Sequence, residues 1–213
     1  MENITNSRQR ATLESSPVTA GPSWKESLAR AVRDPVALIE ILQLDKGLLA
    51  EAKKAAEHFP LVVPMEFIRR MQPGDPDDPL LRQVLPLGLE LETAPEGLED
   101  PLGEQDFLRA PGLLKKYHGR ALLVATGTCA VNCRYCFRRN YPYEEAPAGL
   151  EAGEPAFREL EADASIREII LSGGDPLILT DSTIERMVER LDRIPHLSRL
   201  RIHSRLPIVL PAR

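Results

Sequence analysis

The chain has 213 residues, enough for one sizeable domain with an appendage. Its 32 acidic residues outnumber its 27 basic residues, and no basic stripe is visible, so we expect no nucleic-acid partner. No apolar run is long enough to cross a bilayer and no signal segment opens the chain, so we expect neither membrane insertion nor export.

The first part of the chain is expected to be helical. Residues 1–22 are polar and predict a disordered lead-in. Ser23 and Glu26 form a capping-box pattern, which predicts the start of a helix. Apolar residues at helical spacing then predict short amphipathic helices over residues 36–44, 47–59 and 64–71. We interpret these helices as the cover of a core, without chemistry of their own.

Residues 72–112 are rich in proline and acidic residues, which break long helices. The acidic stretch Gly74–Pro79 lacks the spacing and terminal glutamate of an EF-hand, so we expect capped turns there. The apolar side chains of this region predict burial at Leu80, Leu81, Val84, Leu85, Leu87 and Leu89. We therefore assign residues 23–112 to an amino-terminal helical segment with an extended, wrapping end.

Residues 113–213 alternate between predicted strands and helices. Buried strands are expected over residues 121–125, 167–171 and 200–202, and helices over 154–164 and from a capping box at Ser182–Glu185. Strand–helix repeats imply parallel pairing with right-handed crossovers. The expected fold class is therefore α/β.

All three cysteines of the chain, Cys129, Cys133 and Cys136, stand in one short loop after the first of these strands. Three thiolates can hold three corners of a [4Fe–4S] cluster and leave one iron open. A structural zinc site with His118 or His203 as fourth ligand is the alternative, although zinc sites usually separate two short cysteine pairs. Three inert, buried thiols are the remaining alternative.

Each predicted strand of the second half ends in polar residues. Gly173, Gly174 and Asp175 follow the second strand, and His203-Ser204-Arg205 follows the third. The carboxyl ends of barrel strands are where α/β barrels place their active sites. A glycine pair lets the backbone approach a ligand closely, although Gly-Gly-Asp-Pro alone is more often a simple turn.

With these motifs the chain resembles the radical S-adenosylmethionine enzymes, and within them the lysine 2,3-aminomutase family. The resemblance runs from about residue 24 to the end and is weakest over residues 144–165. It is carried by residues 75–85, 111–121, 129–143 and 199–213. It implies a partial (β/α) barrel of roughly three βα units in residues 113–213. It is greatest to the branch that makes (R)-β-lysine from (S)-α-lysine for modification of elongation factor P.

The resemblance also implies cofactors and residue roles. Cys129, Cys133 and Cys136 would hold the [4Fe–4S] cluster, whose open iron binds S-adenosylmethionine, and Gly173, Gly174 and Asp175 would line the methionine amino end of that cofactor. Arg138 would bind the substrate carboxylate through its guanidinium. Pyridoxal phosphate would be contacted by Lys116, Tyr117 and Arg120.

Members of this family continue well past the point where this sequence stops. The lysine that carries pyridoxal phosphate belongs to that further part, so we expect no catalytic residue within the chain and little or no lysine turnover by it. The expected partners are lysine and an electron donor such as flavodoxin or ferredoxin, with an indirect link to elongation factor P and self-association left open. Unpaired thiols and an oxygen-sensitive cluster indicate the cytoplasm. Another radical S-adenosylmethionine reaction, or a zinc-stapled scaffold without activity, are the alternatives.

Overall fold

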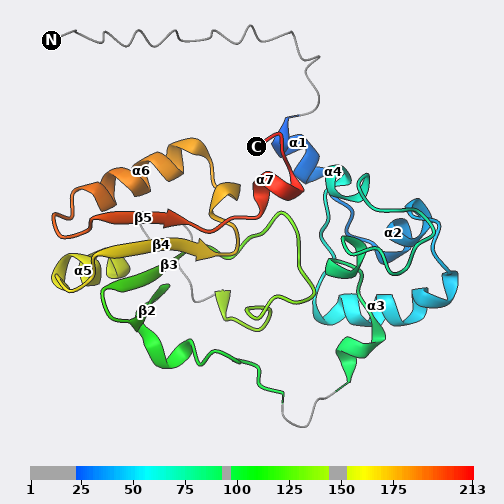
Figure 1. The fold of residues 1–213 in the computed structure, drawn as a ribbon, viewed down its shortest axis with the longest axis horizontal. Helices are drawn as coiled ribbons and strands as arrows, with labels where there is room; N and C mark the ends of the chain where they lie inside the picture. The colour runs from blue at the N-terminus through cyan, green and yellow to red at the C-terminus, as the bar shows by residue number, and fades with distance from the viewer. Residues whose placement is uncertain (1–22, 93–96, 144–152) are drawn as a thin grey trace, which may run out of the picture.

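The computed structural model describes residues 23–92, 97–143 and 153–213, and a five-stranded sheet lies beside a helical part (Figure 1). The lead-in predicted over residues 1–22 lies outside the described residues. The strands follow one another across the sheet in chain order: β1 (Leu108–Ala110), β2 (Leu113–Tyr117), β3 (Arg120–Thr126), β4 (Glu168–Gly173) and β5 (Arg199–Ile202). The α/β class is therefore confirmed.

The parallel part of the sheet agrees with the sequence analysis. β3 pairs with β4 and β4 with β5 in parallel. The antiparallel strands β1 and β2 were not predicted. A two-residue turn at His118 and Gly119 joins β2 to β3, and Gly119 adopts a φ of 74° there. No strands were assigned to residues 108–117 from the sequence, so this hairpin was not predicted.

Helices α5 (Glu154–Ala162) and α6 (Asp181–Asp192) pack on one face of the sheet. The apolar stripes of these helices pack against alternate residues of β3 and β4 and form the sheet core. This core includes Phe157, Leu160, Met187 and Leu191 of the helices and Leu123 and Ile169 of the strands. The capping box predicted at Ser182–Glu185 is wrong. The helix cap is Thr180, whose side-chain oxygen accepts a hydrogen bond from the Thr183 amide at 3.3 Å, so the helix begins earlier.

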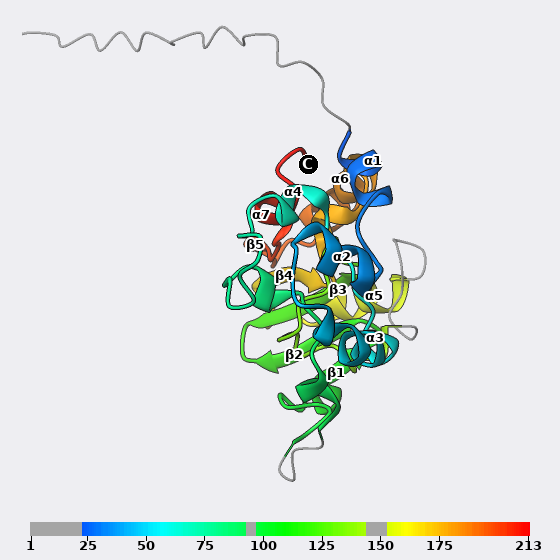
Figure 2. The same cartoon turned by 90° about the vertical axis from the view of Figure 1, so that its right-hand side faces the viewer.

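A second core, the helical core, forms beside the sheet (Figures 1 and 2). It is built by α1 (Trp24–Ala29), α2 (Pro35–Ile41), α3 (Leu49–His58) with the 3₁₀ turn η1 (Lys46–Leu48) before it, α4 (Met65–Ile68) and α7 (Leu206–Val209). The predicted capping box of α1 is confirmed, since the Ser23 amide donates to Glu26 Oε2 at 2.8 Å. Ala130 and Val131 of the cysteine loop are buried in this core.

The wrapping segment contributes three further 3₁₀ turns, η2 (Leu81–Gln83), η3 (Gly88–Leu91) and η4 (Gln105–Phe107). The capped turns predicted around Asp78 are confirmed, because its carboxylate accepts from the amides of Gln72, Leu80 and Leu81. Leu81, Val84 and Leu85 are buried as predicted. Leu89 is 71% exposed, so its predicted burial is wrong; its neighbour Glu90 takes the inward side of η3.

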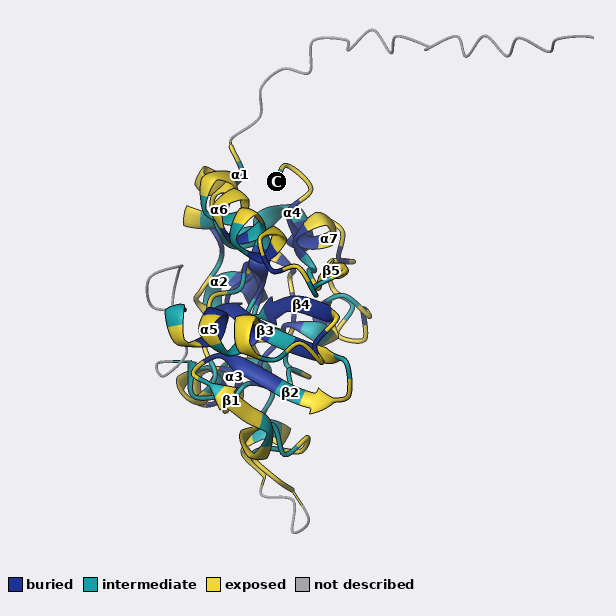
Figure 3. Ribbon diagram, turned by 90° about the vertical axis from the view of Figure 1, so that its left-hand side faces the viewer, coloured by how far each residue is buried: buried dark blue, intermediate teal, exposed yellow. Residues whose placement is uncertain are grey.

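The strands of the sheet differ in how far their residues are buried (Figure 3). β4 is buried along nearly its whole length, whereas β2 passes from buried at Leu113 to exposed at Tyr117 and β5 is exposed at every residue. Within the described ranges, no helix has the length and apolar character needed to span a bilayer.

Candidate functional site

Three loops meet at the carboxyl edge of the parallel strands and surround one cavity of about 500 Å³. The cysteine loop follows β3, Gly173–Asp175 close β4, and His203–Arg205 follow β5. All three cysteines line this cavity together with Arg138 and Ser172. The volume lies within the range of roughly 300–1,000 Å³ that small-molecule pockets occupy.

Main-chain and side-chain hydrogen bonds tie the cysteine loop to the helical core. The Asn132 amide donates to Val62 O at 3.0 Å and its side chain to Pro60 O at 2.9 Å. The Arg134 amide donates to Gln83 O at 2.8 Å. The polar residues of this loop, which look unsuited to a core in the sequence, therefore serve as tethers around the buried pair Ala130 and Val131.

Glu90 is the centre of an ion-pair cluster behind the cysteine loop. Arg134 Nε donates to Glu90 at 2.8 Å, and Arg139 lies 3.1 Å from the same carboxylate. Both guanidinium groups stack on the Phe59 ring, each 4.9 Å from its centroid. Burial would raise the pKa of Glu90, but the hydrogen bonds from Arg134 and Leu87 outweigh it, so the pKa is lowered and the carboxylate stays charged.

The glycine pair is required by the packing of two loops against each other. Gly173 has a φ of 105°, a region that side chains rarely adopt. A Cβ added at Gly174 would lie 2.3 Å from Thr128 O, and the Gly174 amide donates to Thr126 O at 2.7 Å. The close approach expected from the sequence thus exists, but the neighbour is the backbone that leads into the cysteine loop.

Asp175 joins the loop after β4 to the loop after β5. It is 6% exposed, and its carboxylate accepts from the amides of Leu177 (3.1 Å), Arg205 (2.7 Å) and Leu206 (3.0 Å). An ionised carboxylate has about four acceptor positions, so these bonds leave about one for a ligand.

The three thiols are free and partly exposed. Burial raises the pKa of Cys129 to about 12, and the nearby charges of Asp175, Cys136 and Cys133 act in the same direction. Burial also raises the pKa of Cys136. Such clustered thiols need a positively charged group among them to ionise together, which bound iron would supply.

The donor set suits a cluster better than a single ion. No three His, Cys, Asp or Glu side chains within the described ranges converge closely enough to hold one metal ion. Three thiolates are the ligand set of a [4Fe–4S] cluster that keeps one iron open, whereas a structural zinc ion takes four protein ligands. His118 lies at the opposite end of β3, about 20 Å along the strand from the loop, which excludes it as the fourth zinc ligand. His203 lines the cavity.

Arg138 reaches the same cavity but already has a carboxylate partner. Its guanidinium donates to Glu104 through Nε at 2.7 Å and Nη2 at 2.6 Å, and lies 3.4 Å from Ser172 Oγ. The side chains of Arg138 and Glu104 are 9% and 12% exposed. This bidentate geometry is the one by which an arginine binds a carboxylate ligand, and here the carboxylate comes from the chain itself.

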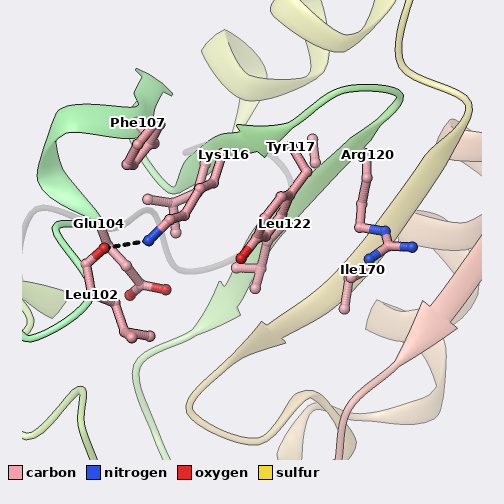
Figure 4. Close-up of a pocket in the computed structure, with 10 residues that line it drawn as sticks. Leu102, Glu104, Phe107, Lys116, Tyr117, Arg120, Leu122 and Ile170 are labelled. Carbon is pink, nitrogen blue, oxygen red and sulfur yellow. Dashed lines mark hydrogen bonds between the residues drawn. The ribbon is translucent and has the colours of Figure 1, made fainter.

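The predicted pyridoxal phosphate contacts lie elsewhere, around a smaller cavity of about 180 Å³ (Figure 4). Lys116 donates to Leu102 O at 2.6 Å, and Arg120 lies 3.1 Å from Glu168. Tyr117 is 63% exposed. Two cations and a phenol are suitable donors for a phosphate group.

The structure thus brings the cysteines, Gly173, Gly174, Asp175 and Arg138 together around one cavity. Lys116, Tyr117 and Arg120 line the smaller cavity, which Glu104, the partner of Arg138, also lines. Sequence reasoning missed Glu90 and Glu104 because each is one acid in an irregular, proline-rich region. No local pattern marks such a residue as the partner of an arginine some 34 to 44 positions away.

Comparison with known proteins agrees with this site. Residues 118–198 match the family model described as a 4Fe-4S single cluster domain. An L-lysine 2,3-aminomutase of Escherichia coli (strain K12) is 49% identical over 191 residues, and one of Haemophilus influenzae is 42% identical; these alignments cover 89% and 90% of the chain. An L-lysine 2,3-aminomutase of Clostridium subterminale is 31% identical over 89% of the chain.

The same alignments cover 56%, 56% and 46% of these proteins, so the chain spans about half the length of the curated relatives it matches. Over most of its length the chain is therefore similar to proteins named L-lysine 2,3-aminomutase, and residues 118–198 match a 4Fe-4S cluster domain.

Proposed function

We propose that this chain forms the cluster-binding and S-adenosylmethionine-binding part of an enzyme that isomerises lysine to β-lysine. The observation that carries the proposal is the convergence of three free cysteines and two further strand-end loops on one cavity. The relatives named L-lysine 2,3-aminomutase support the reaction class. We also propose that β3, β4 and β5 with their helices are the first units of a (β/α) barrel, and that residues 1–22, 23–112 and 113–213 are the three parts of the chain.

Cys129, Cys133 and Cys136 would hold a [4Fe–4S] cluster. The tethers of Asn132 and Arg134 to the helical core fix the loop before any metal arrives, which lowers the entropic cost of binding. With three protein ligands, the cluster would keep one iron open to bind S-adenosylmethionine and would serve as a one-electron reductant.

Residues Gly173–Asp175 would form the wall of the cavity next to the open iron. Gly173 and Gly174 present backbone without side chains, and Asp175 retains about one acceptor position for an ammonium group. Its three amide partners hold Asp175 in place, so this wall is preorganised.

Arg138 would bind the carboxylate of lysine, and Ser172 lies beside it. This role requires that Glu104 yields its place on the guanidinium when a substrate arrives. Lys116, Tyr117 and Arg120 would contact the phosphate of pyridoxal phosphate, whose ring is an electron sink for amino-acid chemistry.

The cellular setting follows from this chemistry. The enzyme would take electrons from a donor such as flavodoxin or ferredoxin, in the reducing cytoplasm that a sensitive cluster needs. The β-lysine product would serve the modification of elongation factor P, as the resemblance to that branch implies.

The cofactor part of this proposal can be tested on the chain itself. Anaerobically reconstituted protein is incubated with dithionite and S-adenosylmethionine, with and without lysine and pyridoxal phosphate, and the products are measured by mass spectrometry. We expect 5′-deoxyadenosine from the wild type and none from Cys136→Ala. Protein that holds four irons but forms no 5′-deoxyadenosine contradicts the proposal. β-Lysine in the complete mixture would support the substrate assignment and contradict the expectation of little or no lysine turnover by this chain.

A further inference from the structure

Arg205 donates a side-chain hydrogen bond to a cysteine sulfur of the candidate cluster site. It follows β5, and its Nη1 donates to Cys133 Sγ. Its second terminal nitrogen, Nη2, donates to Gln83 Oε1 at 2.5 Å, and its backbone amide donates to Asp175 at 2.7 Å. The guanidinium also lies 5.5 Å from the Tyr135 ring centroid. Partners from three separate segments, namely the cysteine loop, η2 and the loop after β4, therefore hold Arg205 in one position.

The other arginines around the cysteine loop are engaged differently. Arg134 and Arg139 donate to or pair with Glu90, and Arg138 donates to Glu104. Their charges are therefore balanced by carboxylates. The guanidinium of Arg205 has a neutral amide oxygen and a cysteine sulfur as its side-chain hydrogen-bond partners. Its positive charge is consequently directed at the sulfur.

Hydrogen bonds to ligand sulfurs and nearby charges set the reduction potential of an iron–sulfur cluster. A cluster gains a negative charge when it is reduced. A fixed cation at a ligand sulfur stabilises that reduced state more than the oxidised state, since the Coulomb attraction grows with the charge. Cys133 and Arg205 are both half-buried, so water and salt screen this interaction less than they would screen a fully exposed pair.

We propose that Arg205 is a positioning residue of the cluster: it fixes the Cys133 ligand and makes the cluster easier to reduce. This inference rests on the proposed function, because it requires that the three cysteines hold a cluster. It adds a residue outside the cysteine loop, from the third parallel strand, to the machinery that controls electron entry. The consequence is that an electron donor of moderate strength suffices to reduce the site.

The test is a redox titration of the reconstituted protein, followed by electron paramagnetic resonance in the absence of S-adenosylmethionine. Arg205→Gln removes the charge, and Arg205→Lys keeps it without the two-pronged guanidinium. Arg139→Gln is the matched control, since it removes one positive charge from the same region where the partner is Glu90. At a fixed ambient potential, we expect the reduced-to-oxidised ratio to fall about tenfold in Arg205→Gln, the size of one charge-assisted hydrogen bond. The reduced-to-oxidised ratio should fall less in Arg205→Lys, and in Arg139→Gln it should stay within about twofold of the wild-type ratio.

Equal ratios in the wild type and Arg205→Gln would overturn the inference, as would an equal fall in Arg139→Gln. A role of Arg205 in binding S-adenosylmethionine, or in packing alone, would leave the ratio without S-adenosylmethionine unchanged and so also counts against it. If Arg205→Gln does not retain iron, Arg205→Lys decides: a lower ratio than the wild type supports the inference, and an equal one overturns it. Failure of the wild type itself to assemble a cluster would instead refute the proposed function.

Discussion

The pair formed by Arg138 and Glu104 predicts a large effect on stability. Two hydrogen bonds of 2.6 and 2.7 Å join these side chains, which are 9% and 12% exposed. Arg138→Met removes the cation and strands the Glu104 carboxylate in this environment. Removal of one partner of a buried pair costs about 3–5 kcal/mol, because the remaining charge is left without compensation. We therefore expect the free energy of unfolding to fall by that amount.

The assay is urea unfolding of the apo protein, followed by far-UV circular dichroism and by the fluorescence of Trp24, the single tryptophan. The double variant Arg138→Met/Glu104→Gln should be less destabilised than the sum of the two single variants, since it leaves no stranded charge. Arg82→Gln is the control: its pair with Asp77 is 4.0 Å long and exposed, so its loss should cost less than about 1 kcal/mol. A cost of less than about 1 kcal/mol for Arg138→Met would refute this account of the pair.

Three further outcomes can be checked. Hydrogen bonds from Lys115 and Ser165 lower the pKa of Asp163 from 3.8 to about 2. The contribution of Asp163 to stability is therefore present above about pH 4 and is lost as the pH falls towards 2. The difference in unfolding free energy between the wild type and Asp163→Asn should close over that window, and a constant difference would contradict this. Gly174→Ala should cost about 1–3 kcal/mol in urea unfolding, because its Cβ would meet the backbone of Thr128; an unchanged midpoint would show that the loops can part freely. In the apo protein at pH 8, iodoacetamide should modify Cys129 much more slowly than in urea, as peptide mass spectrometry can measure, and equal rates would argue against its burial.

The sequence was most informative where one residue pattern has one physical meaning. Short apolar runs such as the one around Ile169 predicted the parallel strands to within about two residues. The capping box at Ser23 was confirmed, whereas the one at Ser182 was wrong because Thr180, two residues earlier, offers a competing hydroxyl. The cysteine spacing predicted a metal site, and the structure places these thiols at a cavity at the end of a strand.

What could not be predicted were contacts between distant segments. Nothing near Glu90 or Glu104 in the chain shows that an arginine of the cysteine loop will face it. The same holds for Arg205, whose guanidinium meets Cys133 only because β5 lies next to β4 and the loops turn toward each other. Such pairings are set by topology and packing, which become visible only once the sheet is assembled.

The central claim is that three sulfur ligands leave one iron free for a sulfonium cofactor. The most direct measurement is electron paramagnetic resonance of the anaerobically reconstituted, dithionite-reduced chain before and after addition of S-adenosylmethionine, together with iron and sulfide analysis. The account predicts about four irons per chain and a signal that changes when S-adenosylmethionine is added. Protein that takes up zinc and refuses iron, or a cluster signal that S-adenosylmethionine leaves unaltered, would contradict it.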